Sequence, residues 1–177
     1  MVRVRDGSRR GDDDFAEFVQ VAWPGLFRSA YLLLGDRGLA EDLAQTALTK
    51  TYVAWARIED PASARAYAQR TLINTASSWF RKRSWRNERP SEALPEVSDA
   101  RHPGARVEVM EALATLPPRQ RAVVVLRYYE DLSVAETADA LGCSTGTVKS
   151  QTFEAFAKLR TQLGDAAIPE TLGAHRG

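Results

Sequence analysis

The chain has 177 residues, of which 44% are hydrophobic and 27% are charged, with a formal net charge of +1. These proportions are typical of globular domains, and no run approaches the ~20 apolar residues that a membrane span needs. A single cysteine excludes a disulfide scaffold and favours the reducing cytoplasm, and two histidines leave almost no material for a zinc site. Because the net charge is near zero, nucleic-acid binding must come from local charge asymmetry.

The first part of the chain shows helical spacing and little of the β-branched alternation that is typical of strands. Apolar residues recur at i, i+3 and i+4 from Phe15 onward. Leu39, Leu43 and Ala47 repeat every four residues, and Asp36 precedes them as an N-cap. The pattern therefore predicts two successive amphipathic helices.

A further helix is predicted over 63–84, after the sequence Glu-Asp-Pro at 59–61 interrupts the pattern. This stretch mixes cations, which suit phosphates, with aromatic rings, which stack on unpaired bases for about 1–3 kcal/mol each. The same aromatic rings also fit an ordinary role in core packing. The side chains are Arg65, Tyr67, Arg70, Trp79, Phe80, Arg81, Lys82, Arg83 and Trp85.

Residues 86–105 read RNERPSEALPEVSDARHPGA, with three prolines, few large apolar residues and no helical period. This composition predicts a flexible linker. We therefore expect an all-α protein of two small helical domains, 12–85 and 106–163, with tails at 1–11 and 164–177.

The strongest local pattern lies between 132 and 160 and predicts a helix-turn-helix. The segment LSVAETADALG reads as a short helix that begins with a capping box of Ser133 and Glu136. Gly142 ends this helix in the left-handed conformation, and Ser144 caps the next one.

The spacing of Ala138, Gly142 and Val148 fits the motif: a small residue where the helices cross, a glycine in the turn and an apolar residue that packs back. Such a pair presents its second helix to the major groove of DNA. The alternative is a solvated polar face in an ordinary three-helix domain. The polar residues of this face are Thr145, Thr147, Lys149, Ser150 and Gln151.

Upstream, Pro117 and Pro118 suit the first turn of a helix, and Val123, Val124 and Leu126 give a buried stripe. Arg119 and Arg121 lie near this helix start and are candidate phosphate or promoter contacts. The composite LPPRQRAVVVLRYYEDLSVAETADALGCSTGTVKSQ closely resembles region 4 of a bacterial sigma factor.

The first domain carries a second resemblance. Residues 40–55, AEDLAQTALTKTYVAW, resemble sigma region 2.2, the helix that docks on the clamp helices of the polymerase largest subunit. Residues 64–85, ARAYAQRTLINTASSWFRKRSW, resemble regions 2.3 and 2.4, which open and read the −10 element. Region 2, a linker and region 4, with no region 3, is the order of the extracytoplasmic-function sigma factors, and several phrases resemble the actinobacterial SigE-like group.

The resemblance implies a dissociable subunit of RNA polymerase that directs transcription initiation in the cytoplasm, without catalysis, cofactor or metal. Its implied partners are core RNA polymerase, through the clamp helices and the flap, and promoter DNA; no membrane is involved. Sigma factors of this class are often held by an anti-sigma factor that covers regions 2 and 4. A flexible linker permits such clamping, although the sequence names no such factor.

For the −35 element, the resemblance maps base contacts onto the second helix of the motif, with Lys149 donating to guanine and Phe153 touching a thymine methyl. Glu154 would repel phosphate there unless it accepts from cytosine or pairs with Lys158 one turn later, and we expect the pairing. The full −35 set is Thr147, Lys149, Ser150, Gln151, Phe153, Glu154, Arg119 and Arg121.

For the −10 element, Asn74 matches the position that helps to form a pocket for a flipped base. Thr46 stands where many family members have Glu, which departs from the pattern of clamp contacts. The −10 set is Tyr67, Arg70, Asn74, Trp79, Arg81, Lys82 and Arg83. The polymerase-docking set is Asp42, Gln45, Thr46 and Thr49.

Two other classes of function are alternatives to this one. A stand-alone helix-turn-helix regulator with an all-α N-terminal domain explains 106–163 equally well and predicts a dimer on a palindromic operator, but it leaves the pattern at 40–85 unexplained. An enzyme is not expected, because His102 falls in the linker, His175 falls in the tail and no glycine-rich phosphate loop occurs.

Overall fold

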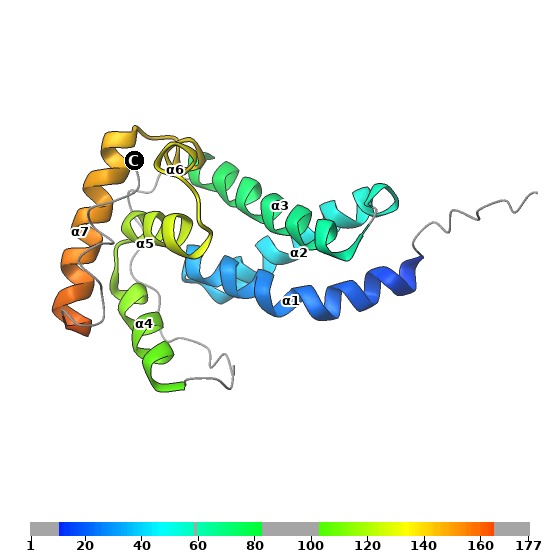
Figure 1. Ribbon diagram of the computed structural model, residues 1–177, viewed down its shortest axis with the longest axis horizontal. Coiled ribbons are helices and arrows are strands. Elements are labelled where there is room, and N and C mark those ends of the chain that lie inside the picture. Colours follow the sequence, from blue (N-terminus) through cyan, green and yellow to red (C-terminus); the bar gives the residue numbers. More distant parts are fainter. Residues whose placement is uncertain (1–10, 59, 83–102, 165–177) are drawn as a thin grey trace, which may run out of the picture.

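The computed structural model describes residues 11–58, 60–82 and 103–164, and the regular elements within them are all helical (Figure 1). The predicted fold class, all-α with two helical domains, is confirmed. No helix in these ranges is both long and apolar enough to cross a membrane. The elements are α1 (Asp12–Leu34), α2 (Arg37–Ala54), η1 (Trp55–Arg57), α3 (Pro61–Lys82), α4 (Pro103–Thr115), α5 (Pro118–Val124), the π-helix η2 (Val125–Tyr129), α6 (Val134–Leu141) and α7 (Thr145–Leu163).

Helices α1, α2 and α3 pack against one another to form the first domain (Figure 1). Their facing sides alternate leucine with alanine, and the small alanines let neighbouring helices approach closely. On α2, Ala40, Leu43 and Ala47 are completely buried, and on α3 Leu72 and Ala76 are buried against them. The four-residue repeat seen in the sequence is therefore the core face of α2.

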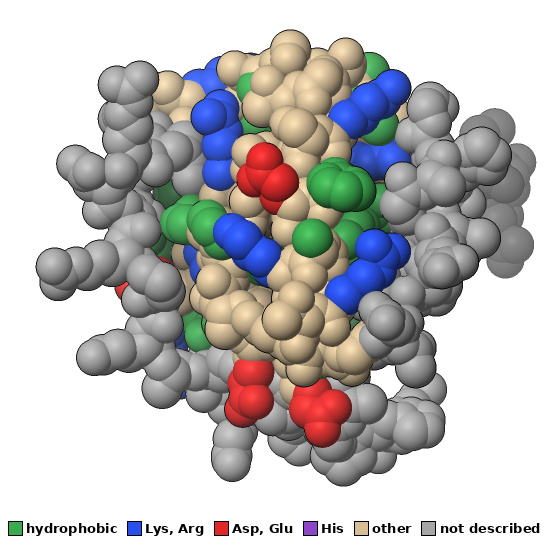
Figure 2. Space-filling view, turned by 90° about the vertical axis from the view of Figure 1, so that its left-hand side faces the viewer, with side chains coloured by type: hydrophobic (Ala, Val, Ile, Leu, Met, Phe, Trp, Pro, Cys, Tyr) green, Lys and Arg blue, Asp and Glu red, His purple; other side chains and the backbone are tan. Residues whose placement is uncertain are grey.

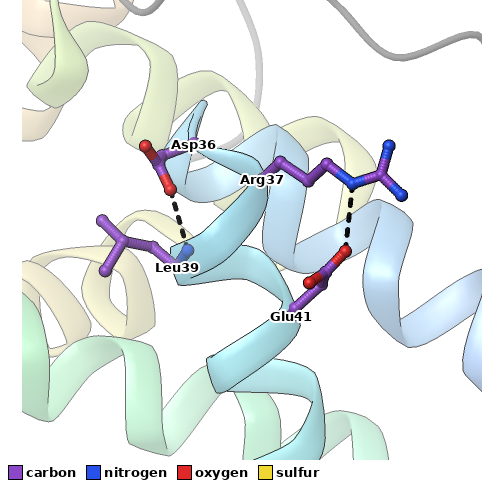
Figure 3. A network of polar contacts seen from close by, with 4 residues as sticks. All are labelled: Asp36, Arg37, Leu39 and Glu41. Atoms are coloured by element: carbon purple, nitrogen blue, oxygen red, sulfur yellow. Dashed lines mark hydrogen bonds and ion pairs between the residues drawn. The ribbon is translucent and has the colours of Figure 1, made fainter.

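The turn between α1 and α2 is short and locally encoded. Gly35 ends α1 with φ +67°, a left-handed conformation that glycine adopts without strain. Asp36 caps α2 as predicted, because its carboxylate accepts the Leu39 N–H at 2.8 Å (Figure 3). One turn later, Arg37 Nε lies 3.0 Å from Glu41 Oε1, an exposed ion pair of modest worth.

The second domain contains the predicted helix-turn-helix, formed by α6 and α7. The capping box is confirmed: Ser133 Oγ accepts the Glu136 N–H at 3.1 Å, and Glu136 Oε2 accepts the Ser133 N–H at 2.8 Å. Gly142 has the expected left-handed φ of +61°. Val148 is fully buried and anchors the start of α7 in the core. The local signals thus fix the angle at which α7 leaves the turn.

The two domains touch each other. Helix α5 and η2 pack on α1, and α6 packs beside α3, as Figure 1 shows where α6 meets the end of α3. Residues 83–102 carry most of the predicted linker and lie outside the described residues. Helix α4 begins at Pro103, inside the stretch expected to be linker, since proline suits the first turn of a helix.

Candidate nucleic-acid interface

The recognition helix α7 starts from a well-defined cap. Ser144 Oγ accepts the Thr147 N–H at 3.1 Å and lies 2.9 Å from Thr147 Oγ1. Ser150 Oγ donates to the Thr147 carbonyl at 3.0 Å. Two of the predicted −35 side chains, Thr147 and Ser150, are therefore engaged within their own helix, where they shape its first turns.

Lys149 and Phe153 stand one turn apart on the exposed side of α7. The Phe153 ring is 74% exposed, which is unusual for a large apolar side chain. Lys149 is exposed, Gln151 is partly exposed, and neither makes a hydrogen bond within the part of the chain that the structure describes. Figure 2 shows this side of the molecule, where blue Lys and Arg side chains flank a largely polar surface with green apolar groups between them.

Glu154 does not pair directly with Lys158 as the sequence suggested. Gln120 of α5 stands between them: its Nε2 donates to Glu154 Oε2 at 2.8 Å, and its Oε1 accepts from Lys158 Nζ at 2.9 Å. Gln120 is only 4% exposed. This bridge ties α7 to α5 and turns the Glu154 carboxylate toward the protein, which the sequence could not reveal because Gln120 lies far away along the chain.

The two arginines of α5 separate in the structure. Arg119 is exposed and free to approach a phosphate. Arg121 is only 4% exposed, and its Nη2 donates to the Leu34 carbonyl at the end of α1 at 2.9 Å. In this arrangement Arg121 lies at the contact between the domains, where its guanidinium is covered by protein.

The −10 candidates on α3 fall into two groups. Tyr67, Arg70, Asn74 and Arg81 recur at three-, four- and seven-residue spacing, so they share the side of α3 that faces away from the core. Tyr67 is 41% exposed, which suits a ring that could stack on a base. Trp79 instead lies partly buried against the hydrophobic core. Lys82 is exposed at the end of α3, and Arg83 lies outside the described residues.

The docking candidates form one face of α2. Asp42, Gln45, Thr46 and Thr49 recur at helical spacing, and Asp42, Gln45 and Thr49 are exposed. The two threonine hydroxyls are bonded to their own helix, Thr46 Oγ1 to the Asp42 carbonyl at 2.7 Å and Thr49 Oγ1 to the Gln45 carbonyl at 2.9 Å. Only Asp42 and Gln45 therefore present unengaged polar side chains on this face.

Val53 extends this face by one more turn and was missed in the sequence. It lies four residues after Thr49 and is 80% exposed. Its four-residue spacing from Thr49 was the available signal, but a lone valine near a helix end gives no sign of its exposure until the packing of α2 is known.

Two shifted pKa values among the described residues have structural causes. The pKa of Glu136 is lowered, chiefly because the backbone N–H of Ser133 donates to its carboxylate. The pKa of Tyr31 is raised, mainly by burial. Within the described ranges no cluster of three His, Cys, Asp or Glu side chains is arranged to hold a metal ion.

Comparison with known protein families matches each domain separately. Residues 18–86 match the model described as Sigma-70 region 2, and residues 106–159 match the model described as Sigma-70, region 4. Both matches follow the order expected from the sequence.

Comparison with individual proteins gives the same result. The chain is 47% identical to the RNA polymerase sigma-E factor of Streptomyces coelicolor over 85% of its length and 86% of that protein. It is 33% identical to the ECF RNA polymerase sigma factor SigL of Mycobacterium tuberculosis over 81% of its length and 85% of that protein. Among solved structures, it resembles the sigma factor RpoE of Bartonella quintana, solved in complex with the anti-sigma factor NepR. That match has a TM-score of 0.58 and 25% identity, and it covers 86% of this chain and 98% of the other.

The comparisons and the fold lead to the same assignment. One domain carries a helix-turn-helix with an exposed recognition helix, and the other carries the region 2 helices, in a family whose members are not enzymes. The chain therefore belongs to the extracytoplasmic-function group of the sigma-70 family and is an RNA polymerase sigma factor with region 2 and region 4 promoter-recognition domains.

Proposed function

We propose that this chain divides promoter selection among three of its surfaces. The exposed face of α2 docks on the clamp helices of the polymerase largest subunit. The exposed side of α7 reads the −35 element, and the outer face of α3 reads and helps to open the −10 element. The −10 face is supported by Tyr67, Arg70 and Asn74, which are exposed together on α3.

The observation that carries this proposal is the α2 face. Asp42 and Gln45 keep their polar atoms unengaged, and Val53 adds an 80% exposed apolar side chain at the end of the same face. An unengaged carboxylate and an exposed apolar side chain on one helix face can be matched by complementary charge and apolar surface on a protein partner.

In this proposed function the polymerase brings both domains of the chain to the promoter. Near-neutral net charge makes the affinity of the free chain for DNA weak, because non-specific binding depends on cationic contacts to phosphate. Polymerase docking places both domains on the promoter at once, so that two weak contacts act together. We further propose that the chain acts in the cytoplasm, that region 4 also contacts the flap, and that an anti-sigma factor competes for the same surfaces, as NepR accompanies its relative.

The first experiment is co-elution of the purified chain with actinobacterial core RNA polymerase on a sizing column. Asp42→Lys is expected to lower the affinity for core polymerase roughly tenfold or more, because it reverses the charge that the docking face presents to its partner. Glu17→Lys on α1 makes the same change in net charge at another exposed position of the first domain and serves as the matched control.

Three outcomes of this experiment distinguish docking through α2, docking through another surface, and a stand-alone regulator. Loss of the complex with Asp42→Lys but not with Glu17→Lys supports the α2 face. Equal binding by both variants moves the docking surface elsewhere. If the wild-type chain forms no complex with active core polymerase, the stand-alone regulator replaces the proposal, and a palindromic operator becomes the next target.

A further inference from the structure

A polar stripe runs along the side of α7 that contacts α5 and the end of α4. Its members are Glu154, Lys158 and Gln162, which lie one helical turn apart. Gln162 Nε2 donates to Thr115 Oγ1 at the end of α4 at 2.7 Å. Glu154 and Lys158 both bond to Gln120 of α5, so the whole stripe is engaged by neighbouring helices.

The amide of Gln120 lies between an anion and a cation. Its Nε2 donates to Glu154 Oε2 at 2.8 Å, and its Oε1 accepts from Lys158 Nζ at 2.9 Å. A flipped amide would place its oxygen against the carboxylate and its NH₂ group against the ammonium, so the two charges permit only one orientation. Both bonds involve a charged group and are therefore stronger than bonds between neutral groups. Because Gln120 is only 4% exposed, the surrounding protein holds the amide in this position.

These bonds add direction to the contact between α7 and the rest of its domain. Val148, Ala155 and Leu159 supply buried apolar contacts on α7. Apolar burial is non-directional, whereas a hydrogen bond requires a particular distance and angle. A satisfied polar network therefore selects one rotation of a helix about its axis among those that bury similar apolar area.

The side chains proposed to read DNA form the neighbouring stripe of α7. Phe153 directly precedes Glu154 in the chain, and Lys149 lies one turn before Phe153. Because a helix turns as a rigid unit, a rotation of α7 that carries Glu154 away from Gln120 turns Phe153 and Lys149 by the same angle. Contacts to base edges depend on the direction of the side chain, so such a rotation would weaken them.

We infer that Gln120 is a positioning residue for −35 recognition: by holding Glu154 and Lys158 it fixes the rotation of α7 and directs Lys149 and Phe153 at the bases. The inference rests on the proposed function of α7. It assigns Glu154 a contact inside the protein in place of a contact with DNA.

The test exchanges the donor and the acceptor of the bridge. Gln120→Glu keeps an acceptor for Lys158 but places a carboxylate against that of Glu154. The measured quantity is the discrimination ratio, the affinity of the holoenzyme for a promoter with the native −35 element divided by its affinity for single-base variants of that element. Gln120→Glu is expected to lower this ratio roughly tenfold, the worth of one base contact.

A second substitution restores the bridge with its polarity reversed. In Gln120→Glu combined with Glu154→Gln, the introduced amide donates to the introduced carboxylate, which still accepts from Lys158. The double variant is therefore expected to recover most of the lost discrimination. Glu154→Gln alone keeps an acceptor for the Gln120 amide and is expected to cost much less than Gln120→Glu.

Val124→Ala is the control for loss of stability. It removes buried apolar atoms from the same helix as Gln120 without removing a polar contact to α7. Its thermal midpoint should fall, because a core side chain is truncated, while its discrimination ratio stays at the parent value. An equal fall of the ratio in Val124→Ala and Gln120→Glu, or a double variant that does not recover, overturns the positioning role. A change of preference at a single −35 base in Glu154→Gln overturns it as well, because Glu154 would then read DNA itself.

A double-mutant cycle in the free chain keeps this inference apart from the proposed function. Gln120→Ala, Glu154→Ala and their combination, compared by chemical denaturation, measure the bridge without DNA. Independent effects of the two changes overturn the bridge. Coupled effects with an unchanged discrimination ratio in Gln120→Ala overturn the positioning role and leave −35 reading by α7 intact. A parent holoenzyme that does not discriminate −35 bases overturns both proposals for α7, while the measured coupling still stands.

Discussion

Phe153 is the residue whose environment says most about what α7 does. An apolar ring that is 74% exposed adds little to folding, since nearly all of its surface still meets water. It stands one turn from Lys149, which is also exposed. In the proposed function the ring touches a thymine methyl and the neighbouring amine reaches guanine, so the pair would read base edges in the major groove.

Phe153→Ala should therefore separate recognition from stability. Its free energy of unfolding is expected to stay within about 0.5 kcal/mol of the parent, because the side chain is exposed. Affinity of the holoenzyme for promoters with the native −35 element should fall by about 1 kcal/mol or more. Chemical denaturation and promoter binding measure the two quantities.

Lys149→Ala tests the neighbouring side chain. It is expected to weaken recognition of one −35 base by about 1–3 kcal/mol and to leave co-elution with the polymerase unchanged. Holoenzyme that still discriminates that base as the parent does would remove Lys149 from base recognition. A uniform loss over all sequences would make it a phosphate contact.

At the scale of the element, the start of α6 is held by hydrogen bonds between residues only three apart in the chain. Its capping box satisfies the first backbone N–H groups and holds the turn that aims α7. Because hydrogen bonds from Ser133 lower the folded-state pKa of Glu136, this stabilisation is present above the unfolded pKa near 4.5 and is lost as the pH falls through the lower folded value.

Glu136→Gln is expected to remove that pH dependence. The thermal midpoint of the parent should exceed that of the variant at about pH 7, and the difference should shrink as the pH falls below 4.5 and the Glu136 carboxylate is protonated. Thermal unfolding followed by circular dichroism over this range measures it. A difference that stays constant with pH would show that the charge of Glu136 does not contribute.

At the scale of the whole molecule, buried side chains of both domains form one continuous cluster. Leu33 of α1 and Leu126 of η2 both belong to it and are completely buried. Domains that share a core and a buried arginine contact are expected to unfold together, although a chain of two such domains joined by a linker often unfolds in two steps.

Calorimetry of the free chain should accordingly show a single transition. Arg121→Ala is expected to lower and broaden this transition, because one buried polar contact between the domains is lost while the shared apolar cluster remains. Arg57→Ala should leave the single transition unchanged. Two transitions already present in the parent chain would mean that the domains are energetically independent.

The sequence predicted the local features well, and for a physical reason. Asp36, Ser133 and Gly142 act through hydrogen bonds and backbone angles within a few residues, so their roles are encoded in the adjacent sequence. The same holds for Leu43 and Ala47, whose spacing defines the core face of α2. Family membership followed from two such local patterns in the right order.

The sequence by itself thus determined the helices, their caps, the helix-turn-helix and the sigma-70 class. Only the tertiary structure decided that Arg121 is buried at the end of α1, that Gln120 bridges Glu154 and Lys158, and that Val53 stays exposed. Each of these depends on partners distant in the chain or on the absence of a covering helix. Whether a polar side chain faces DNA or its own protein is fixed by what packs against it, and adjacent residues do not encode that.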